Sequence, residues 1–181
     1  GKRNPHNSGL LVPMIVKIPQ PFQDKMPRDF GIDKESERLI AFVDLAPTVL
    51  TLAGIDVPEH MQGQAFLGAK KLPKKQYLYG FRGRMDERYD RIRVIRDHRY
   101  LYMKNYMPHR PHGQYLTYQF ETPTTQVMYK LYEEGKLTPE QAYFWEPKTS
   151  EELYDLEADP DEVNNLVDDP DHSHILKKMR K

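Results

Sequence analysis

An apolar run near the start of the chain most constrains what this sequence can fold into. The run, Leu10–Pro19, reads Leu-Leu-Val-Pro-Met-Ile-Val-Lys-Ile-Pro and is apolar on both alternating faces. That pattern is typical of a strand in an open α/β sheet, which helices cover on both sides. Pro13 has no N–H to donate, so the strand lies at a sheet edge or begins after this residue. Because no strand–helix alternation precedes the run, we expect the rest of the sheet to lie upstream, outside this sequence.

The stretch Phe42–Ile55 carries the start and stop signals of a helix. Asp44 is the predicted N-cap, and Pro47 falls in the first turn, where its missing donor costs little. Gly54 stands where a left-handed residue ends a helix. We therefore expect a packed helix from about Leu45 to Ala53. Its predicted buried stripe consists of Leu45, Val49, Leu50, Leu52 and Ala53.

Strand signals dominate the second half of the chain. Gln76–Phe81 alternates like a half-buried strand, and Arg91–Arg96 with Tyr100–Lys104 predicts a hairpin that turns at residues 97–99. Glu152–Leu156 predicts a fourth strand. The expected fold class is therefore an α/β fragment followed by an α+β unit with a roughly four-stranded antiparallel sheet.

Three helices are predicted around these strands. The first has Thr122 as N-cap, Pro123 at its first position and Gly135 as its stop. A short second helix begins after Thr138 and runs to about residue 144, and a last one begins at about Asp171. The first helix is expected to pack into the core through Val127, Met128, Leu131 and Tyr132.

Charge and composition exclude several classes of protein. Lys plus Arg and Asp plus Glu both number 27, so the net charge of zero argues against a globally basic nucleic-acid binder. No cysteine is present, which excludes a disulfide framework and a thiolate site within this chain. The longest apolar run is far shorter than the roughly 20 residues that span a bilayer, so no membrane span is predicted. Seven arginines crowd one segment, where interleaved acidic residues favour a solvated face with local ion pairs over a nucleic-acid site: Arg82, Arg84, Arg88, Arg91, Arg93, Arg96 and Arg99.

Four stretches, in their order and spacing, carry a resemblance to a known family. They are Lys2–Val16, Asp44–Gly54 with Gln62-Gly63 behind it, Arg91–Tyr102, and Glu152–Leu166. Together they resemble the C-terminal portion of the sulfatases, within the alkaline-phosphatase-like superfamily. The resemblance implies that residues 1–72 form the end of the catalytic α/β domain and its sheet. Residues 73–181 then form the small C-terminal α+β subdomain with packed helices.

The resemblance also implies parts of the enzyme that this sequence lacks. Sulfatases use a formylglycine, made from a Cys or Ser in a Cys-x-Pro-Ser-Arg-like motif, and a calcium ion held by Asp and Asn or His ligands. Neither motif is recognisable here, so no residue of this chain is expected to bind either cofactor. We expect the isolated chain to be inactive and the missing N-terminal part of the enzyme to be its partner. By resemblance the location is exported, periplasmic or lysosomal, and the oligomeric state is left open.

One catalytic position of the family has a counterpart in this sequence. In sulfatases a Lys that contacts the sulfate lies seven residues before the Gly that leads into the Val-Pro strand, and Lys2 stands seven residues before Gly9. An ammonium aimed at the sulfate oxygens stabilises charge that builds up as sulfur is attacked. His6 stands where the family often has Tyr or His, and Asn7 where it often has an acid. The resemblance therefore implies a catalytic role for Lys2.

A loop rich in His and Pro supplies candidate substrate-binding residues. In sulfatases, loops of the C-terminal subdomain help to hold the group that bears the sulfate. Arg110 can form paired hydrogen bonds with a carboxylate or a second sulfate, and His109 and His112 can bond sugar hydroxyls. The alternative is a solvated loop stiffened by prolines. A metal site on the two histidines is disfavoured, because the sequence reveals no third ligand.

An acidic cluster near the end of the chain admits two interpretations. Asp155, Asp159, Asp161 and Glu162 resemble a calcium site in composition. Capping of a strand and the turn behind it explains them more simply, and in the family this motif is structural.

The predicted function is hydrolysis of sulfate esters by the complete enzyme, on a sulfated small molecule or glycan. The stretch 123–147 is similar to sulfatases that act on N-sulfated glucosamine, so N-sulfo groups are a second candidate substrate. A phosphonate or phosphodiester hydrolase of the same superfamily and a non-enzymatic binding module for acidic polymers are the alternatives. We also expect the isolated chain to associate, because residues 10–18 would lack their sheet partners.

Overall fold

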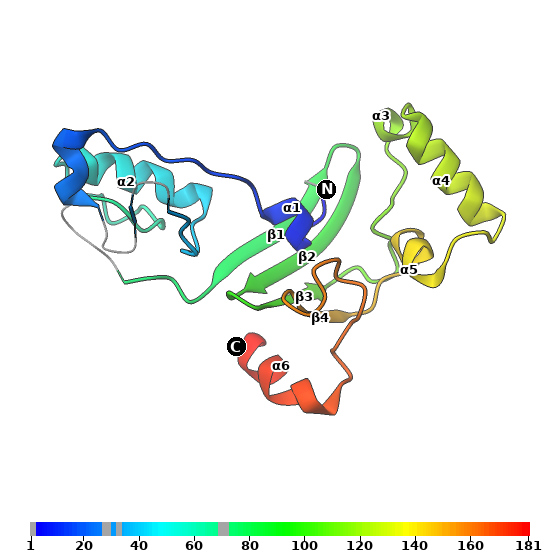
Figure 1. Ribbon diagram of the computed structural model, residues 1–181. Coiled ribbons are helices and arrows are strands. Elements are labelled where there is room, and N and C mark those ends of the chain that lie inside the picture. Colours follow the sequence, from blue (N-terminus) through cyan, green and yellow to red (C-terminus); the bar gives the residue numbers. More distant parts are fainter. Residues whose placement is uncertain (1–2, 27–29, 32–33, 69–72) are drawn as a thin grey trace. The chain divides into compact units, whose positions relative to one another are not determined.

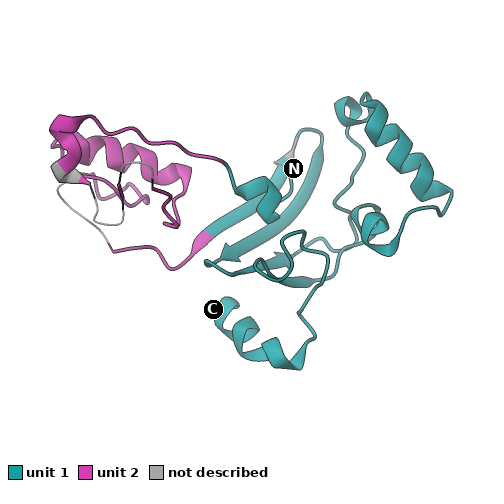
Figure 2. Cartoon of the chain, in the orientation of Figure 1, with its two compact units in different colours: residues 1–12, 79–181 teal, residues 13–78 magenta. Residues whose placement is uncertain are grey.

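The computed structural model describes residues 3–26, 30–31, 34–68 and 73–181 (Figure 1). It separates into two compact units, shown in Figure 2. Residues 1–12 and 79–181 form the first, here called the sheet unit, and residues 13–78 form the second, here called the α2 unit. The predicted division between residues 72 and 73 concerns the complete enzyme and stays a prediction.

Four strands in the order β1-β2-β3-β4 organise the sheet unit (Figure 1). Their bounds are Leu78–Met85, Arg88–Arg96, Tyr100–Asn105 and Glu151–Asp155. β3 pairs antiparallel with both β2 and β4. The carboxylate of Asp97 closes the β2–β3 turn by accepting hydrogen bonds from the backbone N–H groups of Arg99 and Tyr100. The predicted antiparallel sheet is confirmed, as is its hairpin.

The main apolar cluster of the sheet unit lies on one face of these strands. It consists of Ile92, Val94, Leu101, Met103 and Tyr154, with Leu156 packed against them. Buried and exposed residues alternate along the middle of β2, as the period of two in a strand requires. Burial of this face stabilises the folded sheet, since each fully buried aliphatic side chain contributes about 1.5–3 kcal/mol to the free energy of folding.

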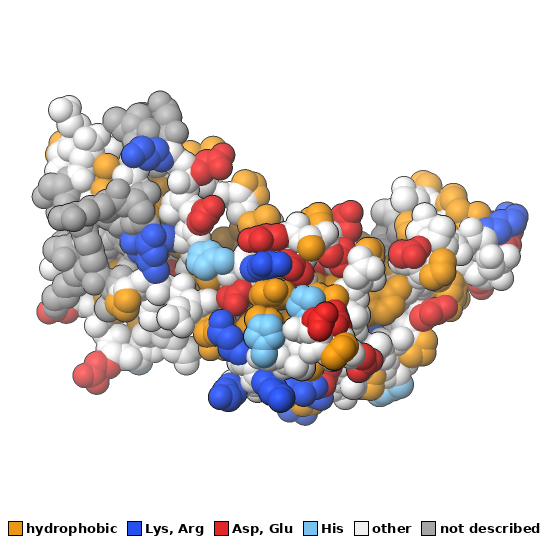
Figure 3. Space-filling model, turned by 60° about the horizontal axis from the view of Figure 1, so that its bottom comes forward, with side chains coloured by type: hydrophobic (Ala, Val, Ile, Leu, Met, Phe, Trp, Pro, Cys, Tyr) orange, Lys and Arg blue, Asp and Glu red, His pale blue; other side chains and the backbone are white. Residues whose placement is uncertain are grey.

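Arginines of the sheet take internal partners. The guanidinium of Arg91 lies 4.8 Å from the ring centroid of Tyr106, and that of Arg93 lies 5.5 Å from the ring of Phe81. Arg99 donates to the carboxylate of Asp155 at 2.6 Å. Basic and acidic side chains lie among one another over much of the face that Figure 3 shows. These arginines therefore make ring contacts and the local ion pairs that the sequence predicts.

Helices surround the sheet at the predicted places. α4 spans Pro123–Glu133 and Gly135 follows it with φ +65°. Thr138 caps α5 by accepting the N–H of Gln141. The remaining helices are α1 (Asn7–Leu10), α3 (Thr117–Phe120), α5 (Pro139–Ala142) and α6 (Ser173–Met179), with 3-10 turns at Tyr143–Trp145 and Pro170–His172.

The predicted core stripe of α4 is wrong. No residue of α4 is buried, and Val127 is 58% exposed. The helix contacts the rest of its unit through aromatic rings instead, with Tyr129 and Tyr132 at 5.2 and 6.3 Å from the ring of Trp145. These ring contacts with Trp145 attach α4 to the rest of the sheet unit.

The predicted central helix is present in the α2 unit, but it buries a different face. The unit contains 3-10 turns at Gln20–Lys25 and Phe42–Asp44, followed by α2 (Leu45–Leu52), after which Gly54 takes φ +76°. The buried residues of α2 are Pro47, Thr48 and Thr51, whereas Leu45 and Val49 of the predicted stripe are 39% and 64% exposed. The threonines face the returning loop, where the hydroxyl of Thr51 donates to the carbonyl of Leu67 at 2.7 Å.

Asp44 occupies the N-cap position of α2, as predicted, but its side chain makes no capping hydrogen bond to that helix. Its buried carboxylate accepts the N–H of Ala41 at 2.9 Å, in the 3-10 turn before the helix, and the N–H of Gln64 at 2.7 Å. The ammonium of Lys75 binds the same carboxylate at 2.6 Å. Gly63 passes so close that an added Cβ would lie 1.9 Å from the carbonyl oxygen of Val43. Asp44 therefore ties a loop back onto the helix start.

The predicted strand over Leu10–Pro19 is also wrong for this structure. α1 ends at Leu10 and the following residues are irregular, with Leu11 65% and Ile15 97% exposed. A strand needs a neighbour to satisfy its backbone groups. Among the described residues, all four strands already pair within one sheet. The helices that the structure describes are too short or too polar for any of them to cross a membrane.

Candidate functional site

The segment before and within α1 is fastened to the sheet unit by a series of side-chain contacts. The guanidinium of Arg3 lies 3.6 Å from the ring centroid of Tyr118. Asn4 accepts a hydrogen bond of 2.6 Å from Arg82. These contacts hold the backbone that directly follows residue 2.

Asn7 continues this attachment at the start of α1. Its backbone N–H donates to the carboxylate of Glu162 at 2.8 Å, and its side-chain oxygen accepts from Arg96. Glu162 is 5% exposed and has φ +56°, a conformation that non-glycine residues rarely adopt. The acidic motif near the chain end therefore does more than cap its own turn, because it binds the N-terminal segment.

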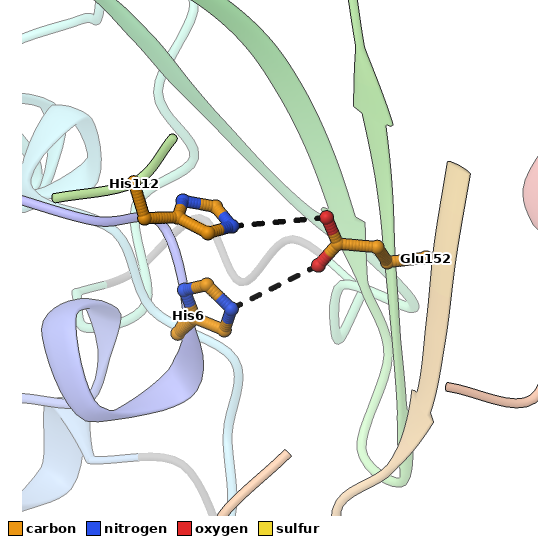
Figure 4. A group of neighbouring side chains, drawn as sticks. All are labelled: His6, His112 and Glu152. Carbon is orange, nitrogen blue, oxygen red and sulfur yellow. Dashed lines mark ion pairs between the residues drawn. The ribbon is translucent and has the colours of Figure 1, made fainter. Parts of the chain in front are cut away.

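His6 brings this segment to a buried carboxylate. Figure 4 shows His6 and His112 pointing side by side at Glu152, which projects from β4. The Nε2 atoms of the two histidines lie 3.9 and 3.7 Å from different oxygens of Glu152. The imidazole rings meet edge to face, with centroids 4.8 Å apart. Three segments that are distant in sequence converge at this point.

Hydrogen bonds orient the carboxylate within this cluster. The phenol of Tyr154, two residues along β4, donates to Glu152 at 2.9 Å, and the side-chain amide of Asn105 in β3 donates to its other oxygen. Alternation along β4 places Glu152 and Tyr154 on the same face. Glu152 is fully buried, so these donors offset the cost of its desolvation.

Burial controls the protonation of the cluster. Desolvation, helped by the neighbouring His112, lowers the pKa of His6 to about 4. Burial alone would raise the pKa of Glu152, but interactions with His112 and Tyr143 hold it below its ordinary value. At neutral pH the cluster therefore combines a neutral His6 with an ionised Glu152.

A second buried network fixes the loop that carries His112. The side chains of Lys148 and Asp90 are completely buried and form an ion pair of 2.7 Å. Lys148 also donates to the carbonyl of Arg110 at 2.7 Å. Burial lowers the pKa of Lys148, which Asp90 opposes. Arg82 joins this network 3.8 Å from Asp90.

The structure separates the residues that the sequence grouped as substrate-binding. His109 is exposed, whereas Arg110 donates to the carbonyl of Tyr89 at 2.8 Å. The side chain of His112 is 2% exposed and faces Glu152, so it offers no surface for a sugar hydroxyl. Lys2 lies outside the described residues.

Sequence reasoning missed His6, Glu152 and Glu162 as members of one site. Two signals were available. Glu152 shares one face of its predicted strand with Tyr154, so a buried face there implies a partner for its carboxylate, and the acidic turn after β4 carries more carboxylates than capping needs. Neither signal identifies which distant histidines the strand meets.

A family model described as "N-sulphoglucosamine sulphohydrolase, C-terminal" matches residues 1–134. The chain belongs to this family. An ulvan-active sulfatase of Formosa agariphila is 38% identical over 99% of the chain, and a second one from that organism is 31% identical over 96%. The solved structure of a 2-O GAG sulfatase matches 81% of this chain and 25% of its own chain, with a TM-score of 0.52 and 26% identity.

These comparisons identify the chain as the C-terminal part of a sulfatase. It spans only 29% and 34% of the length of the two ulvan-active relatives. The four-stranded antiparallel sheet with its helices corresponds to the fold of the structural neighbour. The predicted family and fold class are therefore confirmed.

The cofactors of the sulfatase resemblance do not fit the residues of this chain. Among the described residues, His6, His112 and Glu152 are the single group of three side chains arranged closely enough to hold a metal ion. Two of its three donors are nitrogen, whereas calcium takes oxygen ligands. The sequence also has no cysteine from which a formylglycine forms.

Proposed function

We propose that the complete protein is a sulfatase that hydrolyses sulfate esters of a carbohydrate. The observation that carries this proposal is the 38% identity to an ulvan-active sulfatase over nearly the whole chain. The second ulvan-active relative and the GAG sulfatase structure support a polymeric, sulfated sugar. The formylglycine and the calcium, which supply the nucleophile and positive charge, belong in this proposal to residues outside this chain.

In this proposal, the sheet unit positions the segment that begins with Lys2. The ammonium of Lys2 binds the sulfate oxygens, and the contacts of Arg3, Asn4 and Asn7 fix the residues that follow it. A charge that is held in position before the reaction costs no reorganisation as the transition state forms. Attachment of this segment is the contribution of the chain to catalysis.

In this proposal, the exposed end of the loop around residue 109 contacts the substrate. His109 is exposed, and Arg110 is partly exposed while one of its nitrogens binds Tyr89. Both side chains can donate hydrogen bonds to sulfate or hydroxyl groups of a neighbouring sugar.

The proposal is tested with the complete enzyme and four substrates. These are ulvan, a 2-O-sulfated glycosaminoglycan, N-sulfated glucosamine and a phosphodiester. We expect sulfate release from at least one polysaccharide and none, or far less, phosphodiester hydrolysis. Turnover of the phosphodiester without sulfate release would reject the proposal in favour of the related hydrolase class.

N-sulfated glucosamine is the second candidate substrate, because the matching family model is described by that chemistry. Release of sulfate from the N-sulfated sugar alone would favour it over O-sulfate esters. Turnover of O-sulfates alone would reject it.

Two variants of the complete enzyme separate the proposed roles. Lys2→Ala is expected to lower kcat/KM by about 10²–10³, because it removes charge stabilisation in the transition state. His109→Ala is expected to raise KM for the polysaccharide with little change in kcat. Equal effects of both variants on kcat would contradict this assignment.

We further propose that the complete enzyme is exported. A polysaccharide is too large to reach a cytoplasmic enzyme without prior degradation. Separation of periplasmic or secreted material from cytosol, followed by detection of the protein, tests this location.

A further inference from the structure

The side chains of His6, His112 and Glu152 form a cluster whose donor atoms are not satisfied by one another. Neither ring nitrogen of His112 has a hydrogen-bond partner among the described residues. Its distance of 3.7 Å to Glu152 is too long for a hydrogen bond. An unpaired polar group that is this deeply buried costs about 1–3 kcal/mol. Both ring nitrogens of His112 are therefore available to a ligand.

We propose that these three side chains bind a divalent transition-metal ion of the zinc class. The structure brings one ligand atom from each residue within 4.8 Å of the others. Two imidazole nitrogens and one carboxylate oxygen are the donor set that zinc takes in open sites. The proposal is independent of the sulfatase reaction and concerns a different ion from calcium.

The three ligand atoms must approach one another to bind one ion. Tetrahedral zinc with ligands at about 2.0–2.2 Å holds neighbouring donor atoms roughly 3.4 Å apart. The Nε2 atoms of His6 and His112 lie 3.9 and 3.7 Å from two different oxygens of Glu152, and the three ligand atoms lie within 4.8 Å of one another. Both rings already turn these nitrogens toward the carboxylate, as Figure 4 shows. Side-chain movements that shorten these separations by up to about 1.4 Å would complete the coordination.

The surroundings resemble the outer shell of a metal site. The phenol of Tyr154 and the amide of Asn105 hold the carboxylate of Glu152 in one orientation. Such bonds fix the direction in which a ligand presents its free electron pairs. The side chain of His6 is 17% exposed, so an ion and a water ligand can enter from that side.

Bound metal would join three segments of the sheet unit. His6 precedes α1, His112 lies in the loop between β3 and α3, and Glu152 is in β4. One ion would cross-link them and stabilise the folded state, because the unfolded chain has no such arrangement. The expected role is structural attachment of the N-terminal segment.

The test measures zinc in the 181-residue chain after dialysis against a zinc buffer and removal of free metal. We expect about one equivalent in the wild type and in the matched control His109→Ala, whose imidazole is exposed in the same loop. His112→Ala and Glu152→Gln are expected to weaken binding at least about 100-fold, since each removes a ligand. Cobalt(II) in place of zinc should give the intense visible absorption of a tetrahedral site.

Two further variants keep the proposal testable if the buried substitutions unfold the chain. His6→Asn changes the more exposed ligand, and it should abolish the rise in melting temperature that zinc gives the wild type. Tyr154→Phe preserves the core ring and should weaken zinc binding roughly 10-fold through the loss of one orienting bond. Zinc content that is equal in the wild type and in folded His6→Asn would overturn the proposal, as would the absence of zinc from the wild type.

Discussion

The two units differ in how they use their apolar residues. The sheet unit buries a cluster of them on its paired strands, where Ile92 and Leu101 are fully inaccessible. The α2 unit buries Phe66 and Leu67, but it leaves Ile15 almost completely exposed, and its helix buries threonines. Adjacent antiparallel strands satisfy each other within a short stretch of chain. The apolar run around Ile15 has no neighbouring strand in this structure, so its apolar side chains stay exposed.

Polar networks show the same difference. The Lys148–Asp90 pair of the sheet unit is sealed from solvent, whereas the Lys75–Asp44 pair of the α2 unit keeps a lysine side chain 17% exposed. A sealed pair costs more to disrupt, because the remaining charge has no access to water. The following variants test this difference between the two units.

The largest effect is expected for Asp90→Asn in the sheet unit. It leaves the buried charges of Lys148 and Arg82 without their carboxylate, and should lower the free energy of unfolding by about 3–5 kcal/mol. Urea denaturation followed by circular dichroism measures the loss. The matched control is Glu134→Gln, which breaks an exposed pair with Lys136 and should cost under about 1 kcal/mol. Similar losses in both variants would contradict the distinction.

A matched pair of Leu→Ala variants tests the apolar side of the comparison. Leu101→Ala in β3 removes a fully buried side chain and should cost about 2–5 kcal/mol. Leu45→Ala in α2 removes one that is 39% exposed, and should cost under about 1 kcal/mol. The same urea titration measures both. A loss at Leu45 as large as that at Leu101 would show that the α2 face is covered in solution.

Glycine substitutions probe the tight packing of the α2 unit. Gly63→Ala places a methyl group 1.9 Å from a backbone carbonyl oxygen, so the loop must shift, at about 1–3 kcal/mol. Gly83→Ala in β1 meets nothing within 4 Å and should have little effect. Thermal unfolding of both variants measures the difference. Equal melting temperatures would show that the loop around Gly63 yields without cost.

These comparisons also explain what the sequence could predict. The strands, the β2–β3 turn, the bounds of α4 and the cap of α5 depend on residues close together in sequence, and all were predicted. Burial of α2, α4 and Leu10–Pro19 depends on which surfaces meet, so a periodic apolar pattern alone gave the wrong face or the wrong element. The candidate site could not be predicted from the sequence for the same reason, because His6 and Glu152 meet only after the sheet has formed.

Glu162 gives the sheet unit an expected dependence on pH. Its pKa is raised to about 7 in the folded state by burial and by Asp159, whereas in the unfolded chain a glutamate titrates near 4.3. The folded state therefore holds this proton more tightly, so the contribution of Glu162 to stability is fully present below about pH 4 and is lost as the pH rises through 7.

The variant Glu162→Gln should remove this loss of stability at rising pH. Relative to the wild type, the variant is expected to gain stability between pH 5 and pH 8, as measured by urea titrations at each pH. His6 acts in the opposite direction below about pH 6.5, because its folded pKa is lowered to about 4. It is present in both proteins and cancels in the difference. Glu133→Gln on the exposed surface of α4 is the control, and the same pH trend in that variant would exclude Glu162 as the source.

Substitutions in the exposed apolar run are expected to have the smallest effect on stability. They should have a clear effect on the association of chains. Leu11 and Ile15 are 65% and 97% exposed, so contact between chains would remove apolar surface from water. The double variant Leu11→Lys with Ile15→Lys should change the free energy of unfolding by less than about 0.5 kcal/mol. It should nevertheless reduce association in sedimentation velocity experiments. Val127→Lys on α4 is the control in the sheet unit, because that residue is 58% exposed but isolated on a helix that buries none of its residues. A wild-type chain that stays monomeric at high concentration would contradict the expectation that the run needs a partner.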